Sequence, residues 1–303
     1  MVIRKLLLCG GSGLLGKTLA QHLLREGVQI VLLVRRSPQP DPESNVVEVE
    51  WHPERPGDTV DLRPLEGCYA AVHMAGANLA GHRWTPAYKR LIVSSRVDPA
   101  RALGRIFTAL AAPPPVVVAA SGINYYGDRG NEVLTESSQP GVGFLAETCQ
   151  AWEAATSTLA PRVVQLRFGV VLTARGGALP RLMRVFRLGL GGPLGSGRQW
   201  MSWLSLEDAV AAMEFALAQP HLSGAFNTTS PHPVTNAEFA HTLGRILHRP
   251  TLFRVPSLVL RAALGEMAQD ALLASTRAIP ERLRTAGFQF SHERLEQAIT
   301  EMV

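Results

Sequence analysis

A glycine-rich turn near the start of the chain separates a short apolar run from a helical pattern. Residues 3–9 are apolar apart from Arg4 and Lys5, and the segment Gly10–Gly16 follows. Leucines then recur at helical spacing up to Gly27, and an apolar run from Gln29 to Val34 comes next. Strand, glycine turn, helix and strand form the opening unit of a nucleotide-binding sheet. We therefore predict an α/β fold built on a doubly wound parallel sheet, the Rossmann architecture.

The glycines of this turn have distinct predicted roles. Gly10 permits the sharp turn out of the strand, Gly13 lets a pyrophosphate approach the backbone, and Gly16 lets the helix pack closely on the sheet. The helix that follows offers free N–H groups and the positive end of its dipole to phosphates. The predicted cofactor-binding residues of this turn are Gly10, Ser12, Gly13, Leu14, Leu15 and Gly16.

The end of the second strand distinguishes between the two dinucleotide cofactors. An acidic residue at this position would bind the ribose hydroxyls of NAD, but the chain has Val34-Arg35-Arg36-Ser37. Because guanidinium groups suit a 2′-phosphate, Arg35 and Arg36 favour NADP(H) as the cofactor. The alternative is that both arginines are ordinary surface charges.

Further strands and helices alternate along the chain. Strands are predicted at 69–74, 116–120, 163–168 and 224–228, and helices at 86–110, 144–159 and 207–217, the first of them broken near Asp98-Pro99. Ala75 and Gly76 follow a strand, where small residues let the backbone lie against a cofactor. Beyond about residue 230 the pattern becomes mainly helical, with helices predicted at 235–247, 258–264, 265–273 and 291–302. We predict a Rossmann domain over 1–230, with a glycine-rich insertion at about 173–205, and a small C-terminal substrate-side domain over 231–303.

Composition excludes several classes of function. No apolar run approaches the roughly 20 residues that span a bilayer, so no membrane partner is expected. The net charge of +5 comes mostly from scattered arginines without a recognition motif, so no nucleic acid is expected either. Three widely spaced cysteines, Cys9, Cys68 and Cys149, predict neither disulfides nor a metal site and favour the cytoplasm.

Taken together, these motifs resemble one known family. The chain is similar to the extended short-chain dehydrogenases/reductases, and more closely to their atypical branch, the epimerase family proteins, which carry a C-terminal domain of unknown function. The resemblance spans the whole chain, and its marks are the glycine turn, His73-Met74-Ala75-Gly76, Arg83-Trp84, Ser94-Ser95-Arg96, Tyr125-Tyr126-Gly127, 144–153, Arg167, 169–172, 189–197, Gln199-Trp200 and Arg249-Pro250. It implies an NADP-type cofactor, with Asn78 and Arg83 near its nicotinamide half or phosphates, a small-molecule substrate, and a possible homodimer.

The chain departs from the wider superfamily in its proton chemistry. Working members use a Ser or Thr, a Tyr, and a Lys four residues after that Tyr. Here Cys149 stands at the expected tyrosine position and Glu153 at the expected lysine position. A carboxylate raises the pKa of a neighbouring acid, whereas an ammonium group lowers it. The Cys149 thiol is therefore not expected to be a reactive thiolate.

Three interpretations of these residues remain open. The chain is an oxidoreductase or nucleotide-sugar-epimerase-like enzyme that uses other groups, with Tyr125 or Tyr126 as proton donor, Ser121 as oxyanion partner and Cys149 as an acid. The candidate catalytic residues are then Ser121, Tyr125, Cys149 and Glu153. Alternatively, it is a catalytically silent NADP(H)-binding sensor or scaffold. In the third interpretation Cys149 is a small buried filler, Glu153 is a helix-surface or salt-bridged acid, and Tyr125 is a packed aromatic.

Three other groups of residues carry weaker predictions. Trp200 and Trp203 are predicted either to form a substrate-facing wall or to pack in the core. We interpret His73 as a structural histidine at a strand end, and Asp208 as a capping or hinge residue.

Overall fold

The computed structural model describes residues 4–39, 41, 44–55 and 59–303. Its centre is a seven-stranded parallel sheet in the order β11-β7-β5-β4-β1-β2-β3. The strands are β1 (Lys5–Cys9), β2 (Gln29–Val34), β3 (Val46–Glu50), β4 (Ala70–His73), β5 (Val116–Gly122), β7 (Arg162–Phe168) and β11 (Gly224–Thr228). The strand order reverses between β1 and β4, where doubly wound sheets bind their ligands. The predicted fold class is confirmed, and β3 is a strand that the sequence analysis did not predict.

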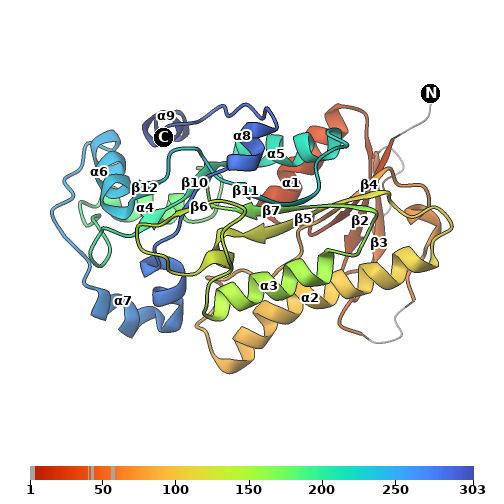
Figure 1. Ribbon diagram of the computed structural model, residues 1–303, viewed down its shortest axis with the longest axis horizontal. Coiled ribbons are helices and arrows are strands. Elements are labelled where there is room, and N and C mark those ends of the chain that lie inside the picture. The colour runs from red at the N-terminus through yellow and green to blue at the C-terminus, as the bar shows by residue number, and fades with distance from the viewer. Residues whose placement is uncertain (1–3, 40, 42–43, 56–58) are drawn as a thin grey trace.

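Helices cover both faces of this sheet (Figure 1). On one face lie α1 (Leu14–Arg25) and α5 (Leu206–Ala218), and on the other lie α2 (Pro86–Ala109) and α3 (Phe144–Thr156). Alternate residues of β1 separate the two cores, since Leu6 and Leu8 pack toward α1 and α5 whereas Leu7 packs toward α2. Both faces are apolar because the sheet is covered on both sides.

The predicted break in the helix at 86–110 is wrong. Residues 86–109 form one continuous helix with Pro99 inside it. Proline removes one intrahelical hydrogen bond, but Val97, Ala100 and Leu103 around it are buried against the sheet and α3. Packing along the apolar face outweighs the missing bond, so the helix continues through the proline.

Most of the C-terminal region lies at the end of the molecule where the carboxyl ends of the strands lie, whereas α8 packs beside the start of β11 (Figure 1). Its elements are α6 (Asn236–Ile246), α7 (Ser257–Leu264), a π-helical turn η3 (Ala268–Leu273), α8 (Glu281–Thr285) and α9 (Leu295–Met302). The predicted helix at 291–302 thus begins at Leu295. In the part of the chain that the structure describes, no helix is both long and apolar enough to cross a bilayer.

Three small strand pairs join distant parts of the chain. They are β8 (Val170–Leu172) with β10 (Trp203–Ser205), β9 (Trp200–Met201) with β12 (Val234–Thr235), and β6 (Val133–Leu134) with β13 (Arg277–Ala278). The remaining elements are α4 (Leu179–Arg187) in the glycine-rich segment and two short 3-10 helices, η1 (Arg63–Leu65) and η2 (Ile123–Tyr126). The last two strand pairs connect residues 231–303 to the rest of the chain.

Candidate functional site

The glycine turn forms an open cradle at the amino end of α1. Gly10 has φ +94°, a conformation that favours glycine, and a Cβ on Gly16 would lie 2.5 Å from the Gly10 carbonyl oxygen. A Cβ on Gly13 would lie 3.5 Å from the Gly10 carbonyl oxygen, an ordinary van der Waals contact, so this position is less crowded than Gly16. No side chain caps α1, and its first turn has no acidic residue. Its free N–H groups therefore fit the pyrophosphate of a dinucleotide.

The two arginines that follow β2 differ in their surroundings. The guanidinium of Arg36 binds both carboxylate oxygens of Glu48, at 2.5 and 2.8 Å. This acid comes from the neighbouring strand β3, which the sequence analysis did not pair with β2. Among the residues that the structure describes, Arg35 has no ion-pair partner and is exposed. Arg35 is thus the arginine that remains available to a phosphate.

The loop after β4 is held against α2. The Ala77 amide donates to Ser95 Oγ (2.9 Å), and Arg96 donates to the Ala77 carbonyl (3.1 Å). A Cβ on Gly76 would lie 3.1 Å from the Arg96 side chain, so a larger residue would push that arginine. Ala75 and Gly76 therefore lie beside the glycine turn, with Met74 and Ala75 backbone atoms within 3 Å of a Cβ built on Gly10.

Two predicted residues of this loop have structural partners instead. The side-chain oxygen of Asn78 accepts a hydrogen bond from the Ala80 amide at 2.9 Å. The backbone carbonyl of Asn78 accepts a second hydrogen bond from the Tyr88 hydroxyl. Arg83 reaches toward the C-terminal region, where its guanidinium lies 3.5 Å from the Ala262 carbonyl. Arg83 thus connects the loop to α7.

A buried ion pair anchors Ser121, at the carboxyl end of β5. Glu153 of α3 receives two bonds from the Arg167 guanidinium, both at 2.7 Å, and one from Ser121 Oγ, also 2.7 Å. All three residues are buried. The carboxylate at the expected lysine position is therefore neutralised by an arginine from β7, and the predicted salt-bridged role of Glu153 is what the structure shows.

Arg167 also organises the two tyrosines of η2. Its guanidinium donates to Tyr126 Oη (2.9 Å), which donates in turn to Asn227 Oδ1 (2.7 Å), and burial raises the pKa of Tyr126 to about 12. The same guanidinium stacks 3.5 Å from the centre of the Tyr125 ring. Tyr126 is fully buried whereas Tyr125 is partly exposed, so only Tyr125 can meet a substrate.

Cys149 lies one helical turn before Glu153 and faces the end of β5. Its sulfur would lie 3.7 Å from a Cβ on Gly122. Burial, together with the charge of Glu153, raises the pKa of this thiol to about 11. The thiol is therefore protonated at neutral pH, as the sequence analysis predicts.

A small cavity opens beside these residues. It has a volume of about 190 Å³ and lies between η2, the start of α3 and η3. Asn124, Leu145 and Ala146 form one side, and Gln269 and Asp270 form the other. Asp270 also receives bonds from the amides of Phe144 and Leu145. A substrate at the end of β5 would thus meet side chains from the C-terminal region.

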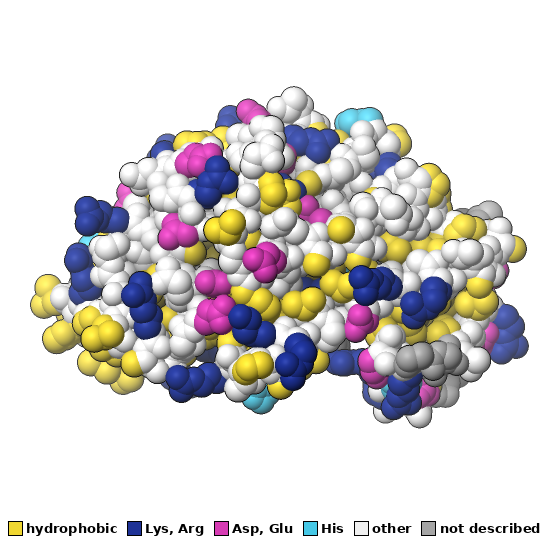
Figure 2. All heavy atoms as spheres, turned by 60° about the horizontal axis from the view of Figure 1, so that its bottom comes forward, with side chains coloured by type: hydrophobic (Ala, Val, Ile, Leu, Met, Phe, Trp, Pro, Cys, Tyr) yellow, Lys and Arg dark blue, Asp and Glu magenta, His cyan; other side chains and the backbone are white. Residues whose placement is uncertain are grey.

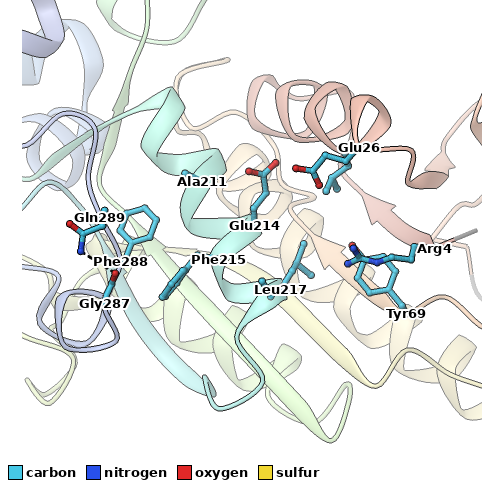
Figure 3. A pocket seen from close by; sticks show the side chains of 12 residues that line it. Arg4, Glu26, Tyr69, Ala211, Glu214, Phe215, Leu217, Gly287, Phe288 and Gln289 are labelled. Atoms are coloured by element: carbon cyan, nitrogen blue, oxygen red, sulfur yellow. Dashed lines mark hydrogen bonds between the residues drawn. The ribbon is translucent and has the colours of Figure 1, made fainter.

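A larger cavity, of about 540 Å³, lies at the opposite end of the sheet (Figure 3). Arg4 and Tyr69 in its wall directly precede β1 and β4, whereas Gly10 and Ala75 follow those strands. Figure 3 shows Glu26, which directly follows α1, and Glu214 of α5 pointing into it. This cavity belongs to neither the glycine turn nor the β5 site.

Trp200 and Trp203, which were predicted either to face a substrate or to pack in the core, differ in their burial. Trp203 is fully buried in the core, and its indole N–H donates to the His232 carbonyl (3.1 Å), so it packs rather than faces a substrate. Trp200 is partly exposed, donates to Asn131 Oδ1 (3.0 Å) and stacks under Arg277. Among the described residues, no three His, Cys, Asp or Glu side chains gather as a metal site requires.

Arg167 is the important residue whose role the sequence analysis missed. A signal was present, because Arg167 is the one charged residue in the predicted strand 163–168 and must find a partner when it is buried. Its partner Glu153 was known only as a departure from the family pattern. Asn227 gave no comparable signal, since its contact with Tyr126 joins residues far apart in the chain.

Comparison with known proteins agrees with this geometry. Residues 6–228 match the NAD dependent epimerase/dehydratase family, and residues 255–302 match a domain of unknown function, DUF1731. The chain belongs to the NAD-dependent epimerase/dehydratase family. The second match identifies the C-terminal region as the one found in the epimerase family proteins, so the resemblance drawn from the sequence is confirmed.

Individual members of the family match over nearly the full chain. "Epimerase family protein Mb2239" of Mycobacterium bovis is 43% identical, covering 96% of this chain and 95% of its own. The crystal structure of human epimerase family protein SDR39U1 with NADPH has a TM-score of 0.86 at 31% identity, covering 98% of each chain. A nucleoside-diphosphate sugar epimerase from Corynebacterium glutamicum has a TM-score of 0.79 at 30% identity, covering 99% of this chain and 58% of its own.

Proposed function

We propose that this chain binds NADP(H) between the glycine turn and the loop after β4. The observation that carries the proposal is the uncapped cradle at α1, together with Arg35 at the end of β2, which forms no ion pair within the described part of the chain. The human relative that was solved with NADPH supports it. Gly10, Ser12, Gly13, Leu14, Leu15 and Gly16 would hold the pyrophosphate, and Arg35 the 2′-phosphate.

Titration with NADPH and NADH tests this proposal. We expect NADPH to bind more tightly, and Arg35→Ala to weaken NADPH about 10-fold or more while leaving NADH unchanged, because a charge-assisted phosphate contact is lost. Arg36→Ala is the matched control and should have a smaller effect, since Arg36 is already paired with Glu48. Equal affinity for the two nucleotides would refute the phosphate assignment.

We further propose that the chain is an oxidoreductase or a nucleotide-sugar-epimerase-like enzyme acting on a small molecule. NADP(H) would supply the hydride chemistry at the end of β5. Ser121, whose hydroxyl proton is committed to Glu153, would accept a bond from a substrate hydroxyl. Tyr125, partly exposed above Arg167, would move the proton, and the neutral Cys149 thiol would border the reacting carbon.

A specific observation favours a second candidate, a catalytically silent NADP(H) sensor. Glu153 and Arg167 neutralise each other, so the cation that the superfamily uses beside its tyrosine has no equivalent in this pair. Offering a metabolite library to the NADPH-loaded protein separates the two functions. A change in nicotinamide absorbance or an epimerised product supports the enzyme, and silence toward the whole library supports the sensor.

Once a substrate is found, two substitutions test which side chain transfers the proton. Tyr125→Phe should lower kcat about 100-fold or more while NADPH affinity stays unchanged, because general acid catalysis is lost. Cys149→Ser should lower kcat by less if the thiol only borders the substrate. Unchanged kcat in Tyr125→Phe would remove Tyr125 from the mechanism.

Location and assembly complete the proposal. We place the protein in the cytoplasm, because its three cysteines are free and buried.

We also propose a homodimer through α2 and α3, which lie side by side on one face of the sheet. Sedimentation at several protein concentrations tests the dimer, and a constant monomer mass would refute it.

A further inference from the structure

Seven large apolar side chains project from one end of the molecule. They belong to the end of α4 with the segment after it, to the segment before α7, and to α7 itself, and their exposed fractions run from 44% at Val185 to 83% at Leu252. The seven are Val185, Leu188, Leu190, Leu252, Phe253, Leu258 and Val259, called the apolar face below. Isolated exposed leucines are ordinary, but a group of this size marks an interaction surface.

The two segments that carry this face lie side by side. The Val255 amide donates to the Pro193 carbonyl (2.9 Å), and Leu194 and Val255 form a bridge. Arg249 donates to the Arg187 carbonyl, also at 2.9 Å. Figure 2 shows hydrophobic side chains gathered at the end of the molecule that α7 occupies, with basic side chains next to them.

The charged side chains within the two segments that carry the apolar face are all basic. Neither residues 174–206 nor residues 239–265 contain an Asp or a Glu. Arg184, Arg187, Arg249 and Arg254 are exposed, and in the part of the chain that the structure describes none of these four arginines forms an ion pair with a carboxylate. A partner for this surface must therefore combine negative charge with an apolar layer.

We propose that the apolar face and its four arginines bind the surface of an anionic lipid bilayer. Phosphate headgroups would pair with the arginines, while Leu252, Phe253 and Leu258 would enter the boundary between headgroups and acyl chains. A second copy of the chain is disfavoured as the occupant because two arginine-rich faces repel each other. The chain lies on the membrane without spanning it, so the short apolar runs in the sequence do not test this proposal.

Vesicle co-sedimentation tests the proposal on the full-length protein. We expect binding to phosphatidylcholine vesicles that contain phosphatidylglycerol, little binding to phosphatidylcholine alone, and release at about 1 M salt, where charges are screened. No binding to either vesicle, or equal binding to both, overturns the proposal. If the true partner is an acidic protein, the chain should bind neither kind of vesicle.

Substitutions locate the binding surface. Leu252→Ser with Phe253→Ser should weaken binding to anionic vesicles at least about 10-fold, because buried apolar contact is lost. Arg184→Glu with Arg187→Glu should weaken it by a similar factor. The matched controls are Val133→Ser and Arg25→Glu, exposed residues of β6 and α1 outside this face, which should bind as the unchanged protein does. If the face variants bind like the controls, the assignment fails.

Discussion

At the scale of single residues, Arg167 explains why a carboxylate can lie inside this fold. Glu153 is buried among α3, β5 and β7, where an unpaired charge would be costly. The Arg167 guanidinium donates a hydrogen bond to each carboxylate oxygen of Glu153, and Ser121 Oγ donates a third hydrogen bond to the same carboxylate. The pair is therefore a structural unit first, and it also sets the position of Ser121.

Removing Arg167 should destabilise the protein strongly. We expect Arg167→Met to lower the free energy of unfolding by about 3–5 kcal/mol, because Glu153 is left buried without its counter-charge. Urea denaturation followed by circular dichroism measures the change. The double variant Arg167→Met with Glu153→Leu should regain most of the loss, and Arg105→Met on the exposed side of α2 serves as control. A single variant as stable as this control would contradict the interpretation.

His73 should make stability depend on pH. It is fully buried, and burial lowers its pKa to about 4 from 6.5. Below pH 6.5 the unfolded chain binds a proton at this residue whereas the folded chain does not until about pH 4, so stability falls as pH falls through this window. The contribution lost between pH 7 and pH 5 is about 2 kcal/mol.

Urea denaturation at pH 7 and pH 5 checks this pH dependence. His73→Gln keeps an acceptor for the Trp152 indole N–H but does not titrate, so it should lack this part of the loss. Equal pH profiles for the variant and the unchanged chain would mean that His73 does not titrate as proposed.

At the scale of elements, Asp208 fastens the first turn of α5 to the segment that precedes α9. Its carboxylate is fully buried and accepts from the amides of Ser291 (2.7 Å) and His292 (3.0 Å) and from Ser205 Oγ (2.9 Å). Ser205 in turn caps α5. The interpretation of Asp208 as a structural rather than a catalytic residue agrees with these contacts.

Replacing Asp208 should therefore loosen the C-terminal segment. We expect Asp208→Ala to cost about 2–3 kcal/mol, because the Ser291 amide, the buried His292 amide and the buried Ser205 hydroxyl lose their acceptor. Hydrogen exchange at residues 291–292 should rise together with the loss of stability in urea. Glu207→Ala, on the exposed neighbour, should change stability by less than about 0.5 kcal/mol. Unchanged exchange at 291–292 would count against the fastening role.

At the scale of the whole molecule, the last 73 positions complete the core that the first 230 begin. Ser202 Oγ bonds the backbone of Thr276 and Ala278, and Asn227 donates to the Ile279 carbonyl. Arg282 reaches the carbonyls of Ser223 and Ala225 beside β11. The predicted division at residue 230 stays a prediction, but these bonds cross it.

A chain cut after residue 230 should accordingly fail to fold alone. Its buried Ser202, Asn227 and Asp208 would lose partners, and the fully buried Trp203 would lose cover from α6 and α9. We expect residues 1–230 to be insoluble or to unfold without cooperativity, as measured by circular dichroism during heating. A soluble fragment that unfolds cooperatively and binds NADPH like the full chain would contradict this expectation.

The sequence alone determined six of the seven strands of the sheet, the glycine cradle and the family. These follow from local features, because hydrophobic periodicity and glycine spacing act over a few neighbouring residues. Local reasoning failed at Pro99, where packing along a long helix overrode the breaking tendency of one residue.

Only the tertiary structure decided what the candidate side chains do. It separated Arg35 from Arg36 through Glu48, joined Glu153 to Arg167, and buried Trp203. Each of these depends on which strand or helix lies beside another, and the pairing energy of two charges depends on their separation and burial. A residue's position along the chain specifies neither quantity, so the site's charges could be listed from the sequence but not paired.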